Sequence, residues 1–255
     1  MSFQSRFGQI ERERIAQRSA EFLWSDAGEP GLEFLKDERK FSDESIRKFE
    51  LGYMPVTEGH QLSGRVIFPI RDPSGNMVAL HSRRVRHNPH YDIKPTWWHE
   101  RFQKSFYLYG VNLAKEKMRQ RNKCLLVEGP SDVIQLASNG IENVIGLCGT
   151  KLSLEQLAVM YRYCSQIIIL LDRDSNFSGQ EAVEKIMETS TGRVKVESGR
   201  MRAGKTVEET EVFGLGFDIV KITLPEFCDP DEYVRRHGIH ALVAVIKAGL
   251  TEAGR

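Results

Sequence analysis

Acidic residues follow three apolar segments of this chain, each close behind the point where the segment ends. They are Glu128, Asp172, Asp174, Asp229 and Asp231. Clustered carboxylates repel each other unless a cation neutralises them, and ligand sets made of oxygen alone favour Mg²⁺ or Mn²⁺. The residue types therefore predict a site for Mg²⁺ or Mn²⁺, provided that the fold brings the three segment ends together.

The chain from residue 124 onwards alternates apolar runs with helical segments. The run at 167–171 is apolar throughout, as expected for a strand whose two faces are both buried. Strands separated by helices of about ten residues predict an α/β domain with a parallel sheet. In such a sheet the carboxyl ends of the strands form the ligand crevice, so the three segment ends are expected at one edge.

Each acid also has a simpler interpretation when it is taken alone. Asp132, just behind Glu128, favours the first turn of a helix whether or not a site exists. Asp229 and Asp231 flank Pro230, which is typical of a turn that leads into a helix. Only the conjunction of acids at the same end of successive strands favours a shared site.

The residues before position 124 predict a separate, basic part of the chain. Residues 5–27 and 31–36 are predicted as helices, Ser42 as a helix N-cap, and 64–85 as a β-hairpin around a "DPSGN" turn. We predict a helical and hairpin subdomain, a catalytic domain and a helical C-terminal end. Their bounds are 1–122, 123–240 and 241–255.

Charge is distributed unevenly around this predicted boundary. Residues 61–123 carry a net charge of +9, and residues 124–191 carry −5. A basic segment beside an acidic one suits a polyanionic partner next to a divalent-metal site. Ordinary surface charge that happens to segregate explains the same counts.

Targeting signals and paired cysteines are not evident in the sequence. It has no apolar run long enough to span a membrane, and its charged N-terminus does not resemble a signal peptide, so we expect a cytoplasmic protein without a membrane partner. The cysteines are far apart and favour buried free thiols over a zinc site. They are Cys124, Cys148, Cys164 and Cys228.

The pattern resembles the Toprim fold and, more specifically, the DnaG-type primases that share this fold. Glu128-Gly129 and the pair Asp172 and Asp174 resemble the two acidic motifs of the Toprim fold. The segments "GRVIFPIRDPSGNMVALHSRRV", "FYLYG" and "LPEFCDPDEYVRRHG" resemble, in order, the RNA polymerase domain of bacterial and phage DnaG-type primases. This resemblance covers roughly residues 31–240. It implies a Toprim parallel sheet preceded by a small basic α+β subdomain.

The resemblance also implies roles for the acidic residues. Primer synthesis from NTPs on a single-stranded DNA template would proceed by two-metal phosphoryl transfer. Glu128, Asp172 and Asp174 would be catalytic and hold Mg²⁺ or Mn²⁺, with further ligands from Asp229 and Asp231. Gly129 and Asp132 would support them. Whether Glu128 binds metal or acts as a general base stays open.

The basic subdomain would bind the template and the nucleotide phosphates. Arg83, Lys94 and Lys104 fall at the family's basic positions, and Arg71 lies in the hairpin itself. Nearby aromatic residues either stack on bases or pack a small hairpin domain. They are Trp97, Trp98 and Phe102.

The sequence departs from DnaG-type primases in some features, and other functions are compatible with its acidic motifs. No zinc-ribbon ligands and no helicase-binding domain are evident, so a separate zinc-binding subunit or a replicative helicase is an expected partner. A Toprim-type nuclease and a non-catalytic RecR-like DNA-binding protein are the alternatives. The stretch "GRMRAGKT" at 199–206 fits a P-loop pattern, but the acidic, glycine-interrupted segment behind it favours a hairpin or loop.

Overall fold

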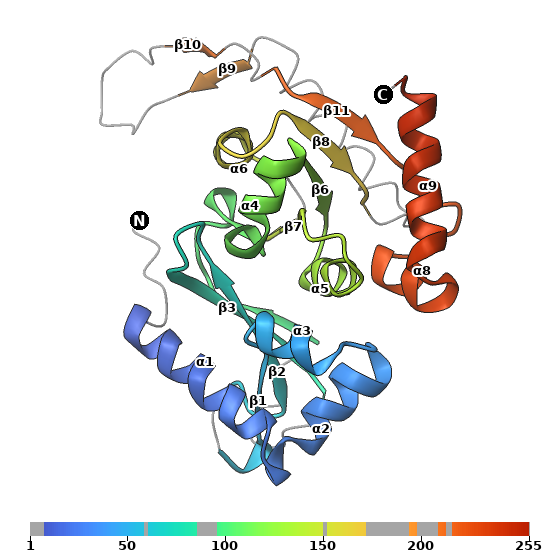
Figure 1. The fold of residues 1–255 in the computed structure, drawn as a ribbon. Coiled ribbons are helices and arrows are strands. Elements are labelled where there is room, and N and C mark those ends of the chain that lie inside the picture. The colour runs from blue at the N-terminus through green and yellow to red at the C-terminus, as the bar shows by residue number, and fades with distance from the viewer. Residues whose placement is uncertain are drawn as a thin grey trace.

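Two sheets with flanking helices make up most of the chain in this computed structural model. The residues that the structure describes are 8–58, 61–85, 96–149, 152–171, 194–197, 209–212 and 216–254. The strands of the first sheet lie between residues 52 and 99, and those of the second lie between residues 108 and 221 (Figure 1).

The first sheet is antiparallel, with strand order β1-β2-β3-β4. Its strands are β1 (Gly52–Met54), β2 (Arg65–Arg71), β3 (Met77–Arg84) and β4 (Trp97–His99). The helical elements around it are α1 (Gln9–Leu23), η1 (Asp26–Gly28), α2 (Glu29–Leu32), η2 (Glu33–Glu38), α3 (Asp43–Lys48) and η3 (Val56–Glu58). Helix α3 begins at the predicted cap, where the Ser42 side chain accepts a hydrogen bond from the Ser45 N–H.

Both faces of this first sheet are covered, which explains the unbroken apolar run in β2. Ile67 joins a cluster with Ile15 of α1 on one face, whereas Phe68 joins the main core with Phe34 of η2 on the other. Successive side chains of a strand point to opposite faces, so each face receives its own apolar set. Gly52 lets α1 approach closely, because a Cβ there would lie 2.1 Å from the Ser19 Oγ.

The second sheet has the order β11-β8-β6-β7-β5, and all of its strands except β5 are parallel. The strands are β5 (Leu108–Tyr109), β6 (Lys123–Val127), β7 (Val144–Leu147), β8 (Gln166–Ile169) and β11 (Asp218–Lys221). The helical elements of this half are η4 (Lys104–Phe106), α4 (Val111–Arg121), α5 (Pro130–Ser138), α6 (Leu154–Tyr161), α8 (Pro230–His237) and α9 (Ile239–Glu252). The predicted α/β class with a parallel sheet flanked by helices is confirmed.

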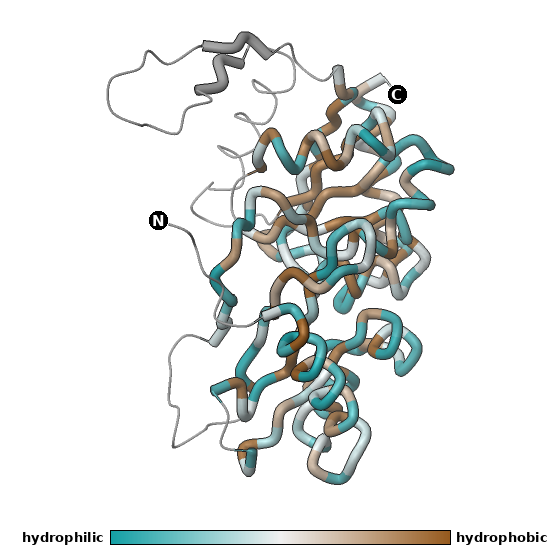
Figure 2. The backbone as a smooth tube through the Cα atoms, turned by 90° about the vertical axis from the view of Figure 1, so that its left-hand side faces the viewer, coloured by the Kyte–Doolittle hydropathy of each residue, from teal (hydrophilic) through white to brown (hydrophobic). Residues whose placement is uncertain are grey.

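Helices cover both faces of the second sheet, so its strands form the apolar centre of this half (Figure 2). Met118 of α4 and Leu157 of α6 pack with Leu126 and Ile145 on one face. Helices α5, α8 and α9 cover the other face.

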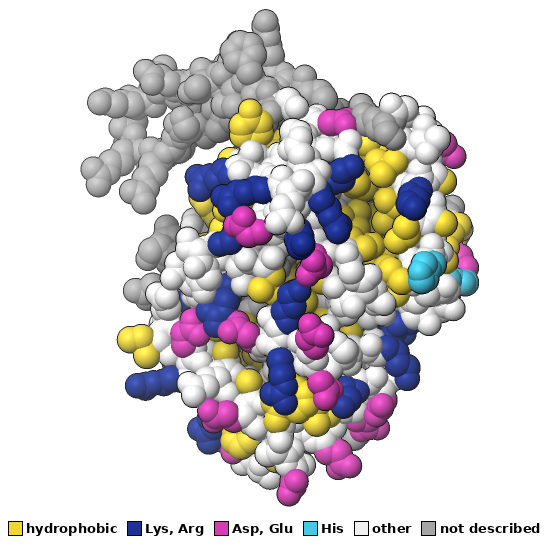
Figure 3. Space-filling view, viewed as in Figure 1, with side chains coloured by type: hydrophobic (Ala, Val, Ile, Leu, Met, Phe, Trp, Pro, Cys, Tyr) yellow, Lys and Arg dark blue, Asp and Glu magenta, His cyan; other side chains and the backbone are white. Residues whose placement is uncertain are grey.

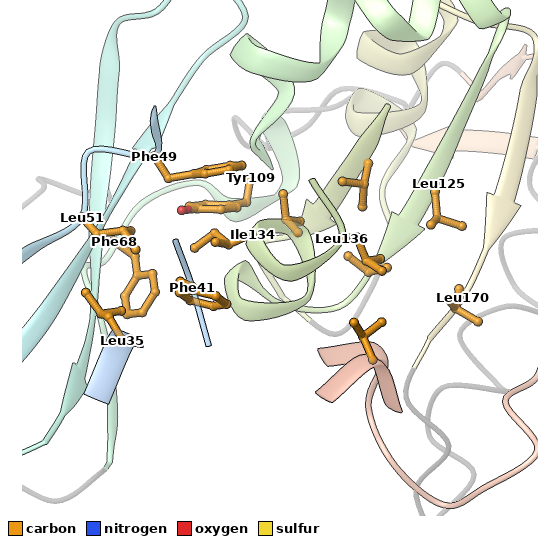
Figure 4. Packing of buried hydrophobic residues seen from close by; sticks show 14 of the residues in the cluster. Leu35, Phe41, Phe49, Leu51, Phe68, Tyr109, Leu125, Ile134, Leu136 and Leu170 are labelled. Carbon is orange, nitrogen blue, oxygen red and sulfur yellow. The ribbon is translucent and has the colours of Figure 1, made fainter. Parts of the chain in front are cut away.

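One core joins the two sheets. Phe49 stacks on Tyr109 of β5 with ring centroids 6.1 Å apart, and Figure 4 shows this pair above Ile134 of α5, with Phe68 of the first sheet in the same cluster. Strand β5 and helix α4 already pack on the second sheet, although both lie before residue 123. The predicted boundary at 122/123 stays a prediction, and in the structure the packing of this half begins at Leu108.

A buried ion pair ties α1 to the far end of the first sheet. Arg12 donates to Glu100 with its Nε 3.0 Å from the nearer carboxylate oxygen, and Glu100 also accepts from the Leu80 N–H. Glu100 is 1% exposed. Its charge is therefore matched inside the protein rather than by water.

The segment that holds the P-loop pattern lies between two short strands, β9 (Val194–Glu197) and β10 (Glu209–Val212). They pair antiparallel in a ladder of their own. A P-loop would be followed by a helix, whereas 209–212 is a strand, so the backbone agrees with the hairpin interpretation. The pattern itself, at 199–206, lies outside the described residues.

Three further expectations concern the surface, the thiols and the membrane. Lys and Arg side chains are interspersed with Asp and Glu over the face in Figure 3, so that face carries no uniform basic patch. All four cysteines are buried free thiols, as predicted. Within the described ranges, no helix combines the length and apolarity that crossing a bilayer requires.

Candidate active-site cleft

A cleft of about 670 Å³ opens between the first sheet and the strand ends of the second. One side is formed by residues that follow β6 and by the start of α8, and we call it the acidic wall: Glu128, Gly129, Asp132 and Asp229. The other side is the basic floor, formed by η4 and by the inner face of β3 and β4: His81, Arg83, Trp97, His99 and Lys104. Arg39, the residue after η2, also lines the cleft. The structure thus brings predicted acidic and basic residues to one place.

Glu128 reaches the cleft because β6 ends one residue before it. Gly129 is then the N-cap of α5, and Pro130 occupies the first helical position, where its missing N–H costs no hydrogen bond. The strand therefore stops at a sharp turn that leaves Glu128 at the carboxyl edge of the sheet. Neighbouring β8 runs parallel to β6, with Ile169 opposite Leu126.

Asp132 links two parts of the acidic wall. Its Oδ2 accepts from the Gly129 N–H at 3.1 Å, and its Oδ1 accepts from the Asp231 N–H, also at 3.1 Å. The side chain is 5% exposed. The predicted supporting role thus has a definite geometry, because one carboxylate fixes the Glu128 turn to the start of α8.

The two acids at the start of α8 lie in different environments. Asp229 lines the cleft and caps α8, since its Oδ1 accepts from the Glu232 N–H at 2.6 Å. Asp231 is fully buried, with Arg39 2.5 Å from its Oδ2 and Arg235 3.2 Å from its Oδ1. Burial raises the pKa of Asp231, opposed by the hydrogen bond from Arg235 and the charge of Arg39.

Arg83 is held on the basic floor by aromatic rings. Its guanidinium carbon lies 5.2 Å from the Phe34 ring centroid and 5.4 Å from that of Trp97, which pairs with it across β3 and β4. Burial, and then the nearby charge of Arg39, lower the pKa of Arg83, yet a guanidinium stays protonated in proteins. Two close cations favour an anion between them.

Lys104 begins a short turn that is hydrogen-bonded to α6 and its N-cap. Gln156, at 1% exposure, donates to the Lys104 carbonyl at 3.1 Å and to the Tyr107 carbonyl at 2.7 Å. Ser153 caps α6 and donates to the Ser105 carbonyl at 2.5 Å. Lys104 and Arg83 both line the cleft, and neither makes an ion pair with a described residue, although the charges of Glu38, Asp231 and Asp229 act on Arg83 from further away.

Several predicted site residues are not brought to this cleft. Arg71 lies near the far end of the hairpin, where ion pairs with Glu13 at 2.8 Å and Glu50 at 2.5 Å hold it. They raise its pKa, although burial opposes them. This contact set favours a structural role for Arg71, and its assignment to nucleic-acid binding stays a prediction. Asp172, Asp174 and Lys94 lie outside the described residues.

The aromatic residues divide between the two proposed roles. Trp97 lines the cleft and packs on Phe68, with ring centroids 5.3 Å apart. Trp98 points to the other face of the sheet and packs there with the cluster around α1. Phe102 packs against Tyr107 and His81. Among these three, only Trp97 lines the cleft, where it could stack on a base.

The described residues meet the chemical requirement of a divalent metal in part. Glu128 and Asp229 supply oxygen ligands to the cleft, whereas Asp231 is neutralised by two arginines. Among described residues, no group of three or more His, Cys, Asp or Glu side chains is arranged to hold a metal. The donor chemistry fits Mg²⁺ or Mn²⁺, and the predicted ligand set would be completed by Asp172 and Asp174.

Sequence reasoning missed Arg39, His81 and His99. Arg39 looks like one more charge in a helical segment, and only tertiary structure places it opposite Asp231, 192 residues further on. His81 and His99 lie two residues from Arg83 and Trp97 on their own strands. The period of two that places Arg83 on the inner face could have identified both histidines.

Comparisons with known proteins agree with this arrangement. Residues 122–199 match the Toprim domain model, which implies dependence on a divalent metal in general. The DNA primase of Enterococcus faecalis (strain ATCC 700802 / V583) is 28% identical over 252 residues, which cover 84% of this chain and 36% of that protein. The chain thus spans about a third of that relative's length.

Solved structures show the same fold. The DnaG catalytic core superposes with a TM-score of 0.75 at 21% identity, covering 94% of this chain and 79% of that one. The DnaG primase catalytic domain bound to ssDNA gives 0.73 at 21% identity, with coverage of 94% and 80%. The expected resemblance is confirmed: the chain carries a Toprim domain and has the fold of a DnaG-type primase catalytic core.

Proposed function

We propose that this chain is the catalytic core of a DNA primase, which makes short RNA primers on a single-stranded DNA template by metal-dependent nucleotidyl transfer. The observation that carries the proposal is the cleft that combines an acidic wall with a basic floor, whose Arg83 and Lys104 form no ion pair with a described residue. Its curated relatives are DNA primases, and a structural neighbour binds ssDNA.

Each side of the cleft has a task in this reaction. Glu128 and Asp229, together with the predicted Asp172 and Asp174, would hold Mg²⁺ or Mn²⁺. Such an ion lowers the pKa of an attacking hydroxyl and stabilises a pyrophosphate leaving group. Asp132 keeps Glu128 in place through the Gly129 N–H.

The basic floor would bind the triphosphate and the template strand. Arg83 offers a planar fork of donors that is already oriented by two rings, so little side-chain freedom is lost on binding. Lys104 adds a second positive charge from the turn that is hydrogen-bonded to α6. Trp97 presents a ring on which a base can stack. A replicative helicase or a zinc-binding subunit would assist initiation from outside this core.

Primer synthesis in a defined mixture tests the proposal. The protein is incubated with single-stranded DNA, the four NTPs and Mg²⁺ or Mn²⁺, and oligoribonucleotides are resolved on a gel. We expect products with the wild-type chain and none with Glu128→Gln. The matched control is Glu142→Gln, which alters an exposed acid paired with Lys48 and Lys117.

Three outcomes would contradict the proposal or part of it. DNA cleavage without NTPs would favour the Toprim-type nuclease. DNA binding without primer synthesis or cleavage, under both metals, would favour a RecR-like binding protein. If Glu128→Gln still makes primers as the wild-type chain does, the acidic wall does not take part in the reaction.

A further inference from the structure

A buried histidine on the basic floor has no hydrogen-bond partner in the part of the chain that the structure describes. His81 lines the cleft and is only 2% exposed, and neither its Nδ1 nor its Nε2 has a partner among the described residues. An unpaired buried polar group destabilises the folded protein. Such groups in native proteins call for a physical explanation, and a ligand or a bound water is the usual one.

The surroundings of His81 hold the ring in place without satisfying its nitrogens. His99 lies opposite on β4, with ring centroids 4.2 Å apart and planes at 76°. Phe102 packs edge-on at 5.8 Å. Trp97 in turn stacks parallel to His99 at 6.2 Å. Ring contacts therefore fix the orientation of His81, and no described residue satisfies its donor and acceptor at the edge of the cleft.

The charge state of His81 restricts what that group can be. Burial first, and then His99 and Lys104, lower the pKa of His81 well below its ordinary value. A neutral imidazole offers one N–H donor and one acceptor nitrogen. That pair suits a hydroxyl or a base edge, whereas phosphates are better matched by Arg83 and Lys104 in the same cleft.

We propose that His81, oriented by His99, hydrogen-bonds the nucleoside part of a ribonucleotide whose phosphates bind Arg83 and Lys104. The ligand chemistry is a neutral hydroxyl or base-edge group next to a triphosphate. This inference rests on the proposed function, since it deepens the description of the same cleft. It adds a contact that selects a nucleoside over a bare polyphosphate.

Equilibrium binding with and without the nucleoside tests the contact. ATP, 2′-deoxy-ATP, CTP and inorganic triphosphate are titrated with Mg²⁺ into the wild-type chain, His81→Leu and His81→Gln. We expect His81→Leu to bind ATP about tenfold more weakly, the loss of one buried hydrogen bond, with triphosphate affinity unchanged. His81→Gln keeps a donor and an acceptor and should recover part of the loss.

Comparing the four ligands identifies the group that His81 contacts. If the ribose hydroxyl is the partner, 2′-deoxy-ATP binds the wild-type chain weakly and His81→Leu removes the difference from ATP. If a base edge is the partner, ATP and CTP respond unequally to the substitution. Equal losses for triphosphate and ATP, or no loss at all, would overturn the inference.

A stability measurement separates ligand binding from a structural role. Because His81 has no partner to lose among the described residues, His81→Leu should leave the urea midpoint unchanged or raise it. A lower midpoint with unchanged nucleotide affinity would show that the ring serves packing alone. Primer synthesis by the wild-type chain is scored separately, so failure of the proposed function and failure of this contact give different results.

Discussion

The two sides of the cleft are built in different ways. The acidic wall depends on hydrogen bonds between distant segments, with Asp132 joining the Glu128 turn to α8 and Arg39 neutralising Asp231. The basic floor depends on a sheet face and on rings, and its cations Arg83 and Lys104 form no ion pair with a described residue. We infer that changes behind the acidic wall affect stability as well as function, whereas changes at Arg83 or Lys104 affect binding alone.

The largest effect is expected at the exposed end of the acidic wall. Glu128→Gln keeps the shape of the side chain but removes a negative charge from the cleft, and we expect primer synthesis to fall at least about a hundredfold. The unfolding midpoint should hardly change. Rates from single-turnover assays measure the loss, and Glu142→Gln should retain wild-type activity. If Glu128→Gln lost activity only because its unfolding midpoint was lower, the inferred difference between the acidic wall and the basic floor would be wrong.

A change behind the acidic wall should cost stability. Arg39→Met leaves the buried Asp231 with Arg235 alone, and we expect the free energy of unfolding to fall by about 3 kcal/mol. Urea unfolding followed by circular dichroism measures it. The control is Lys36→Met, which removes an exposed pair with Asp43 and should cost less than about 1 kcal/mol. Similar losses in the two variants would show that the Arg39 contact is not structural.

A change on the basic floor should affect binding without affecting stability. Arg83→Gln is expected to weaken single-stranded DNA binding about tenfold and to reduce the slope of log K against log salt by about 0.7, the contribution of one phosphate contact. Fluorescence anisotropy at several salt concentrations measures both. Arg71→Gln is the matched control, because its partners are Glu13 and Glu50, and it should leave the slope unchanged. If Arg71→Gln also reduced the slope of log K against log salt, Arg71 would contact the DNA as well.

Acid should weaken the fold through the histidines of the floor. Burial, and then Lys104, lower the pKa of His99 from 6.5 to about 4, and the pKa of His81 is lowered as well. Below pH 6.5 the unfolded chain binds protons at these positions that the folded chain does not bind, so stability should fall from about pH 6.5 to about pH 4. Urea midpoints across this range test it, and His81→Leu should flatten the dependence. An equal slope in the variant would contradict the assignment.

Particular residues show why sequence reasoning found some of this site and missed other parts. Glu128 was identifiable because a strand end, a glycine and a proline are local features. Ser42 likewise marks a helix start by local chemistry, and the structure confirms this cap. The α/β class followed from alternating patterns over short distances.

The remaining features depend on contacts that no local pattern encodes. The bond from Asp132 to the Asp231 N–H joins residues 99 positions apart, and Arg39 reaches Asp231 across 192. Arg71 and Arg83 belong to one hairpin, yet one is bound by glutamates and the other faces the cleft. Their surroundings, rather than their residue type, decide which of the two is available to an anion.

A crystal structure with Mn²⁺ and a non-hydrolysable ATP analogue would test the central claim most directly. The account predicts that Mn²⁺ lies about 2 Å from a Glu128 carboxylate oxygen, with the triphosphate bound to Arg83 and Lys104 across the cleft. Manganese bound elsewhere, with Glu128 uncoordinated and the triphosphate away from the basic floor, would contradict it.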